Sequence, residues 1–200
     1  METRTRMLSG LLCLALAACA GADRRDEEAA PLDDKAVQDV RQTCLAAEGE
    51  NRTAACRKVL RVKPEDDAVE GQLGWLLVQQ DQVPEGLAHL RKALKARPSD
   101  ALLLEHLAVG LEKRGDQAAA VVAYREVLAQ EPGRTALRVD LGVLLRKMKL
   151  REESLKELAE AVQRDPSSAP AGAQLSRTQA QDGKLEEAIE SGLKAVELAP

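Results

Sequence analysis

The chain has 200 residues and a formal net charge of -4, and only 1% of its residues are aromatic. Proteins that bind single-stranded nucleic acids stack the bases on several aromatic side chains, and phosphate binding requires clustered Lys and Arg. This composition therefore argues against a nucleic-acid partner. The two histidines, His89 and His106, are too few for a multi-histidine metal site, and we interpret them as surface or inter-repeat residues. No cofactor and no metal ion are expected.

The N-terminus has the features of an export signal. Arg4 and Arg6 precede an apolar run over residues 7–18, which at about 12 residues is too short to span a bilayer. The run ends in the sequence Leu-Ala-Ala-Cys at residues 16–19. This sequence resembles the lipobox of bacterial lipoproteins.

The lipobox resemblance implies that the signal peptide, residues 1–18, is removed and that Cys19 is lipidated, with palmitate among the acyl chains. A plain secretory signal is the alternative, and it also predicts export. By resemblance to enteric lipoproteins, Ala20 after the lipidated cysteine implies the outer membrane, facing the periplasm of a bacterial cell envelope. Residues 19–33 are small and charged and lack apolar periodicity, which is typical of a flexible tether.

Two cysteines, Cys44 and Cys56, remain in the exported chain after Cys13 has left with the signal and Cys19 carries lipid. In an oxidising compartment such a pair is expected to form a disulfide rather than to stay reduced. Its wide spacing argues against a redox-active motif, in which two residues typically separate the cysteines.

The sequence around these cysteines predicts a helical hairpin. Helices are expected over residues 34–47 and 52–62, with Gly49 ending the first and Asn51 capping the second. An antiparallel hairpin brings the two cysteines face to face, because they lie equally far from position 50.

Prolines recur every 34 residues along most of the chain, at Pro64, Pro98, Pro132, Pro166 and Pro200. The residues between them repeat in register, with a leucine at position 7 of each unit, small residues at positions 8 and 20, and mostly bulky residues at position 24. The members at position 24 are Leu90, Tyr124, Leu158 and Gly192. Apolar residues follow helical spacing throughout, and no stretch alternates as a strand would. This pattern resembles the tetratricopeptide repeat in length and in its order of large and small residues.

The resemblance implies an all-α fold, a right-handed superhelical solenoid of antiparallel helix pairs. Residues 67–200 contain four units, 67–100, 101–134, 135–168 and 169–200, and residues 34–66 form a degenerate leading hairpin. Small side chains at positions 8 and 20 let paired helices approach closely. The usual turn glycine is replaced by Asp81 and Lys149, and Gly192 leaves the last pair underfilled.

In this family the first helix of each pair lines a concave groove. The corresponding groove residues here are Trp75, Val78, Leu102, Glu105, Val109, Lys113, Val139, Val143, Arg146, Lys147 and Arg177. The lining is largely apolar, and its four cations outnumber Glu105 and Glu112 by two. This suits an apolar peptide or helix with acidic residues toward the last two units. Gly71 and Trp75 replace the Lys and Asn with which chaperone-binding members hold a terminal carboxylate, which disfavours that ligand class.

These features predict a non-catalytic protein-binding scaffold. The sequence contains no nucleophile elbow, zinc signature or phosphate loop, which disfavours a hydrolase. The layout is similar to that of outer-membrane tetratricopeptide lipoproteins, which implies a role in the assembly or stability of an envelope complex such as a type IV pilus secretin. A recruiting or regulatory subunit for a cell-wall or outer-membrane assembly enzyme is the alternative. The last unit lacks a polar capping helix, so we expect a longer natural chain, a homo-oligomer or a partner there.

Overall fold

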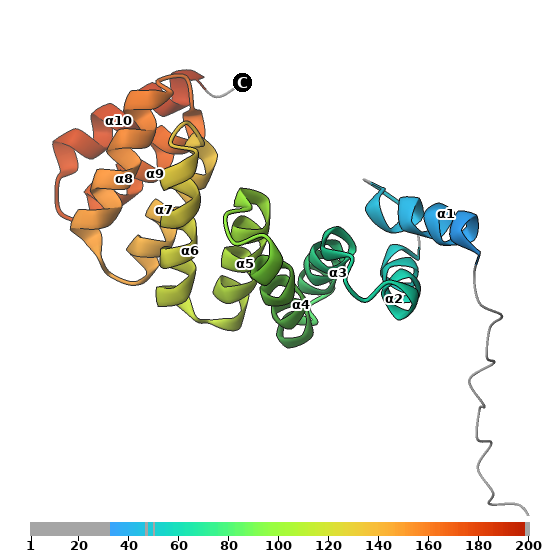
Figure 1. Ribbon diagram of the computed structural model, residues 1–200. Helices are drawn as coiled ribbons and strands as arrows, with labels where there is room; N and C mark the ends of the chain where they lie inside the picture. The colour runs from blue at the N-terminus through green and yellow to red at the C-terminus, as the bar shows by residue number, and fades with distance from the viewer. Residues whose placement is uncertain (1–32, 47, 50, 199–200) are drawn as a thin grey trace, which may run out of the picture. The chain divides into compact units, whose positions relative to one another are not determined.

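The computed structural model describes residues 33–46, 48–49 and 51–198, and it contains ten helices and no strand within them (Figure 1). The predicted signal peptide, the lipidation site Cys19 and the tether up to residue 32 lie outside the described residues. The helices are α1 (Asp34–Leu45), α2 (Arg52–Val62), α3 (Asp67–Gln79), α4 (Val83–Ala96), α5 (Ala101–Arg114), α6 (Gln117–Gln130), α7 (Thr135–Lys147), α8 (Arg151–Arg164), α9 (Ala169–Gln181) and α10 (Leu185–Leu198). None of these helices is long and apolar enough to cross a membrane.

The helices form five consecutive hairpins, and each hairpin packs against the next. Within a hairpin the two helices lie against each other, and the second helix also contacts the first helix of the following hairpin. First helices of neighbouring hairpins also meet, since α1 contacts α3, α3 contacts α5 and α7 contacts α9. Helices α5 and α7 do not approach each other in this way. The predicted all-α repeat fold is therefore confirmed, with its widest spacing between first helices at α5 and α7.

Three first helices, α3, α5 and α9, start at a residue whose side chain caps the helix, whereas Arg134 before α7 makes no such bond. The side chains of Asp66, Asp100 and Ser168 accept hydrogen bonds from backbone N–H groups three residues later, which satisfies a donor that has no partner inside the helix. The predicted glycine replacements, Asp81 and Lys149, both adopt the left-handed backbone with a φ of 64°. The turn geometry is therefore retained without glycine, at a cost of about 1 kcal/mol for each residue.

The close approach of paired helices depends on small residues opposite bulky ones. A Cβ atom added at Gly142 would lie 2.6 Å from Cγ of Leu158, so α7 and α8 leave no room for a side chain there. Ser154 is fully buried at the neighbouring small position, and its hydroxyl donates to the Gly142 carbonyl over 2.7 Å. The order of small and large residues thus sets the spacing of each hairpin.

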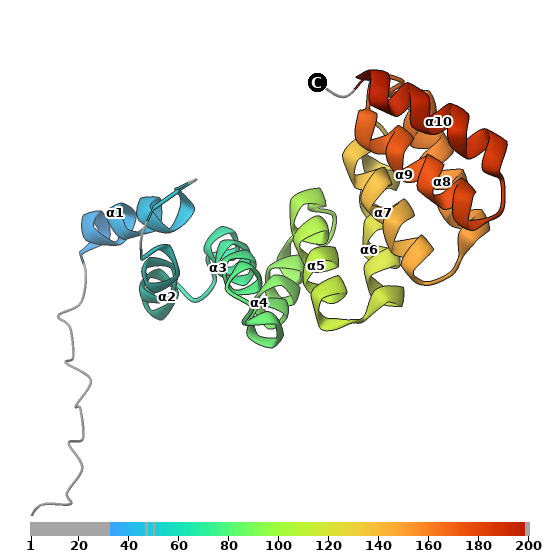
Figure 2. The ribbon, with the colours of Figure 1, turned by 180° about the vertical axis from the view of Figure 1, so that it is seen from behind.

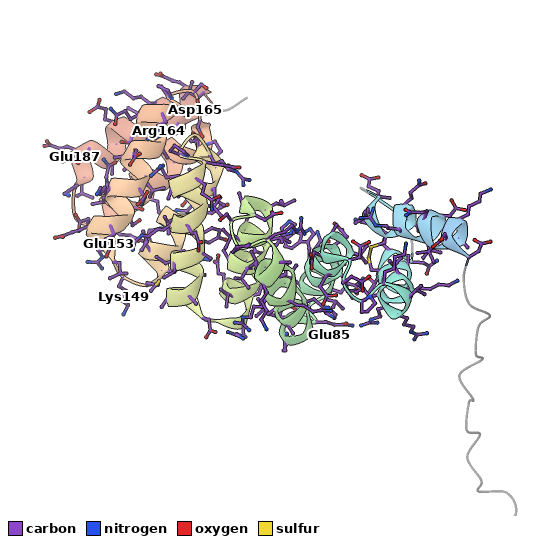
Figure 3. The ribbon with its side chains drawn as sticks, in the orientation of Figure 1. Glu85, Lys149, Glu153, Arg164, Asp165 and Glu187 are labelled. Carbon is purple, nitrogen blue, oxygen red and sulfur yellow. A yellow bond between two sulfur atoms is a disulfide. The ribbon has the colours of Figure 1, made fainter. Side chains whose placement is uncertain are left out.

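A disulfide joins Cys44 of α1 to Cys56 of α2, with their Cα atoms 4.9 Å apart, and is the yellow bond between these helices in Figure 3. The details of the turn differ from the prediction. Helix α1 ends at Leu45 rather than at residue 47. Asn51 has a left-handed backbone with a φ of 62° and makes no side-chain capping bond, because a capping side chain reaches the first turn from an extended backbone.

Candidate peptide-binding groove

A hollow of about 410 Å³ opens between α5 and α7, where the first helices are most widely spaced. It is lined by Val109, Glu112 and Lys113 of α5, Tyr124 of α6, and Asp140, Val143 and Lys147 of α7. Four of these residues, Val109, Lys113, Val143 and Lys147, belong to the predicted groove set. Position in the repeat therefore brings them together on one surface.

Sequence reasoning missed Tyr124 and Asp140 as parts of this hollow. Tyr124 was predicted to be a packing residue at position 24, and its side chain is indeed buried. It also lines the hollow between α5 and α7. Asp140 occupies position 6, which was not among the groove positions. A single aspartate on a helix surface looks the same in the sequence whether it lines a hollow or faces solvent, so Asp140 could not be recognised.

The predicted excess of positive charge over the whole groove does not fall on this hollow, because its two lysines contact other groups of the protein. Lys113 Nζ donates to the Val78 carbonyl over 2.9 Å, and Lys147 Nζ lies 2.7 Å from Oε1 of Glu112. Asp140 adds a carboxylate that the prediction did not count. The lysines therefore tie neighbouring hairpins together, and the hollow is close to electrically balanced.

Two groups in the hollow, Asp140 and Tyr124, have raised pKa values. Burial raises the pKa of Asp140, and the carboxylates of Glu112 and Glu105 raise it further, while Lys147 opposes the shift. Burial also raises the pKa of Tyr124, helped by its hydrogen bond to Glu112 and by the same carboxylates. The Tyr124 hydroxyl is thus kept neutral, which allows it to donate to Glu112.

A cationic site lies beyond the hollow, toward α9. Arg146 Nη2 donates to Oε1 of Gln174 over 2.9 Å. Burial lowers the pKa of Arg146, and the nearby Arg177 lowers it further. Neither arginine forms an ion pair with a carboxylate of the described chain, so two like charges remain available where acidic ligand residues were predicted.

Trp75 packs between two hairpins rather than standing free. Its ring stacks on His106 of α5 with the centroids 4.2 Å apart and the planes 4° from parallel. Burial lowers the pKa of His106 to about 4, so the imidazole is neutral at ordinary pH. Trp75 keeps a partly exposed surface, and its contact with a ligand stays a prediction.

The remaining predicted residues divide into accessible and inaccessible ones. Leu102 is 57% exposed, and Glu105 is half-buried with its carboxylate 2.8 Å from Arg134. Val78 has no exposed surface and Val139 is 8% exposed, because both pack into the hydrophobic clusters between paired helices. The assignment of Val78 and Val139 to the groove lining is therefore corrected.

His89 has a packing role inside a hairpin. Its Nδ1 atom lies 2.9 Å from Oε1 of Glu70, a buried carboxylate that also lies 3.2 Å from Lys92. The corresponding positions two units later hold Arg138 beside Glu157, with the charges exchanged. Within the residues that the structure describes, no group of three or more His, Cys, Asp or Glu side chains is arranged to hold a metal ion.

Part of the chain matches a known repeat family. Residues 111–175 match the family described as Tetratricopeptide repeat, and no curated protein sequence matches the chain. The fold is similar to a crystal structure of MamA, with a TM-score of 0.70 and 16% identity over 84% of this chain and 95% of that one. MamA from Desulfovibrio magneticus RS-1 gives a TM-score of 0.75 and 20% identity over 84% and 97% of the two chains.

A third similar structure is YrrB, described as a TPR protein with an unusual peptide-binding site. Its TM-score is 0.67 and its identity is 22%, over 83% of this chain and 82% of YrrB. At such identities these structures establish the fold alone. The family match within residues 111–175 and the shared architecture of the described helices together support a tetratricopeptide repeat fold.

Proposed function

We propose that this protein is a non-catalytic scaffold that binds a peptide segment of another protein in the groove formed by α5, α7 and α9. The observation that carries the proposal is the hollow between α5 and α7. Arg146 of α7 and Arg177 of α9, which form no ion pair with a carboxylate of the described chain, add positive charge on the neighbouring helices. Tetratricopeptide repeats typically serve as protein-binding surfaces, and the peptide-binding site described for YrrB supports this use of the fold. The preferred ligand has an apolar segment over Val109 and Val143 and an acidic residue at the arginines.

The finer part of the proposal concerns location and partner. The lipobox resemblance at Cys19 supports a lipid-anchored protein of the bacterial envelope, at the outer membrane and facing the periplasm. There the scaffold assists the assembly or stability of an envelope complex such as a type IV pilus secretin. Recruitment of a cell-wall or outer-membrane assembly enzyme uses the same surface and is the second candidate.

The groove is tested by placing a photo-crosslinking amino acid at Val143 and, as a matched control, at Val122 on the exposed face of α6. In intact membranes, the crosslinker at position 143 should capture a partner segment that is apolar and contains acidic residues. The crosslinker at position 122 should not capture this segment. The captured peptide should bind the Val143→Glu variant at least about tenfold more weakly than wild type. Arg146→Glu should mainly slow association, because exposed charges act on the encounter step. Unchanged binding by both variants would exclude the groove.

The anchor is tested separately. Wild type should incorporate a palmitate analogue and remain with the membranes, whereas Cys19→Ser should lose the label and appear in the soluble periplasmic fraction or as an unprocessed precursor. A wild-type chain that takes up no label would contradict the lipid anchor while leaving the groove untouched.

A further inference from the structure

Helix α10 carries a stripe of exposed apolar side chains, the α10 stripe, made of Leu185, Ile189, Leu193 and Val196. Each of these side chains is between 61% and 72% exposed. Outside α10, the large exposed apolar residues of the described chain lie singly on separate elements, at Val62, Leu102, Val122 and Leu150. A continuous apolar stripe of this kind marks an interaction surface.

Two positions of the stripe, those of Ile189 and Val196, are covered in the preceding hairpins, whereas the positions of Leu185 and Leu193 hold mostly polar residues there. The residues equivalent to Ile189 are Leu87, Val121 and Leu155, and those equivalent to Val196 are Leu94, Leu128 and Val162. All six pack in hydrophobic clusters, where α4, α6 and α8 meet the first helix of the next hairpin. Figure 2 shows α10 at the end of the array with no helix of the described chain in front of it. The α10 stripe therefore belongs to a face that is built to receive a helix.

The face is hollowed as well as apolar. A space of about 620 Å³ lies between α9 and α10, lined by Ala169, Pro170, Ala173, Ser176, Arg177, Gly192, Ala195 and Val196. Gly192 stands at the position where other hairpins have a leucine or tyrosine, which opens this space. A docked helix can thus insert side chains instead of resting on a flat surface.

The two edges of this face carry opposite charges. Helical spacing places Glu186, Glu190 and Glu197 along the edge of α10 beside Leu193. Glu190 pairs with Lys194 over 2.6 Å, whereas Glu186 and Glu197 have no cationic partner in the described chain. Arg177 lines the opposite edge on α9. The face therefore favours a partner with basic groups on one side and an acidic group on the other.

An antiparallel pair of α10 helices and a head-to-tail stack of two copies both fit the face poorly. Two α10 helices packed antiparallel would bring their acidic edges together, which is repulsive. In a head-to-tail arrangement α1 would be the incoming helix, but its outward residues Lys35, Gln38, Asp39 and Gln42 are polar and exposed. Neither arrangement supplies an apolar stripe with basic neighbours.

We infer that the face formed by α9 and α10 binds an amphipathic helix of another protein, whose apolar stripe is bordered by Lys or Arg along the edge that meets α10. The docked helix takes the place that the first helix of a further hairpin occupies elsewhere in the fold. This face shares Arg177 of α9 with the proposed groove, but the hollow between α5 and α7 is lined by other residues.

Two synthetic helical peptides with the same leucine stripe test the inference, one with Lys and Arg on the edge facing α10 and one with Glu there. The full chain, kept in mild detergent, should bind the basic-edged peptide at least about tenfold more tightly, as measured by fluorescence anisotropy of the labelled peptide. Ile189→Arg should weaken this binding at least about tenfold, and Val122→Arg, an equally exposed change on α6, should leave it unchanged. The double variant Glu186→Lys/Glu197→Lys should reverse the preference between the two peptides.

Equal binding of the two peptides, or equal binding by Ile189→Arg and Val122→Arg, would overturn the inference. A wild-type chain that dimerises in light scattering, with dimers lost in Ile189→Arg, would show that a second copy covers the face and would also overturn it. Val143→Glu should not affect the binding of these peptides, so failure here and failure of the groove proposal can be distinguished.

Discussion

The first and last hairpins of the described array differ in how repeat position 24 is filled. In the first hairpin, α1 with α2, Cys56 lies 34 residues before Leu90 and so falls at position 24 of the repeat; it is fully buried and linked covalently to Cys44. The last hairpin, α9 with α10, holds Gly192 at that position, and the space beside it stays open. Figure 3 shows Glu187 at the outer edge of α10, among the charged side chains that surround this end.

The difference shows that hairpins with the same repeat pattern can be filled and crosslinked at one end of the array and leave an open apolar face at the other. In a stacked array each hairpin is stabilised by its own helix pair and by its neighbours. An end hairpin has one neighbour fewer, and the disulfide offsets that loss at the N-terminal side by constraining the unfolded chain. Hairpin α9/α10 has no disulfide, and the apolar side chains of the α10 stripe are exposed in the described chain.

The largest expected difference in stability is between two substitutions at the same repeat position, one at an inner junction between hairpins and one on the exposed face of α10. Leu87→Ala removes a fully buried side chain between α4 and α5, and should lower the free energy of unfolding by about 2 to 5 kcal/mol. Ile189→Ala changes the equivalent residue on the α10 stripe, which is 63% exposed, and should cost less than about 0.5 kcal/mol. Urea unfolding of both variants measures the difference. Equal costs would mean that the stripe is already covered in solution.

Breaking the disulfide should come next in size. Cys44→Ser should destabilise the protein by about 2 to 4 kcal/mol, because the crosslink no longer restricts the unfolded chain. Urea unfolding of wild type with and without reductant should show the same loss. In the variant Cys44→Ala/Cys56→Leu, a leucine restores the bulky residue that other hairpins carry at position 24 and should recover part of the stability relative to Cys44→Ala/Cys56→Ala. Identical unfolding with and without reductant would argue against the bond.

The hairpins and the open space at Gly192 could be predicted because each depends on residue size at a fixed repeat position. The pairing of Cys44 with Cys56 could be predicted because the two residues lie equally far from the hairpin turn. The groove was harder to predict. Val78 and Val139 face the interior because of how the first helix of each pair is rotated about its own axis. The periodicity of the sequence alone does not define that rotation. Asp140 and the pairing of Lys147 with Glu112 depend on the separation of neighbouring hairpins, which arises from packing across residues far apart in the sequence.

Lowering the pH should separate the inner junction of α3 with α5 from the two end hairpins, because that junction carries a half-buried histidine and the end hairpins contain none. Burial lowers the pKa of His106 from 6.5 to about 4 in the folded protein. Between these values the unfolded chain binds more protons, so stability is fully present above pH 6.5 and falls as the pH drops toward 4, by about 2 to 3 kcal/mol.

Nuclear magnetic resonance of the two imidazole rings measures the pKa of His106 directly, with His89 as the internal reference. The variant His106→Gln removes the titrating group and should flatten this part of the dependence of stability on pH. A His106 pKa near 6.5 would show that the Trp75 stack does not exclude water in solution.

The smallest effect should come from the open position of the last hairpin. In Gly192→Ala the new Cβ atom would lie 3.0 Å from Oγ of Ser176, a side chain that can adjust, and the substitution favours the helix by about 1 kcal/mol. We therefore expect a change between zero and about 1 kcal/mol in favour of the folded state. The matched change Gly142→Ala meets Leu158 at 2.6 Å inside the array and should instead destabilise by about 1 to 3 kcal/mol. Thermal unfolding of the two variants compares the signs directly, and a loss of stability in Gly192→Ala as large as that in Gly142→Ala would show that α9 and α10 are packed as tightly as the inner hairpins.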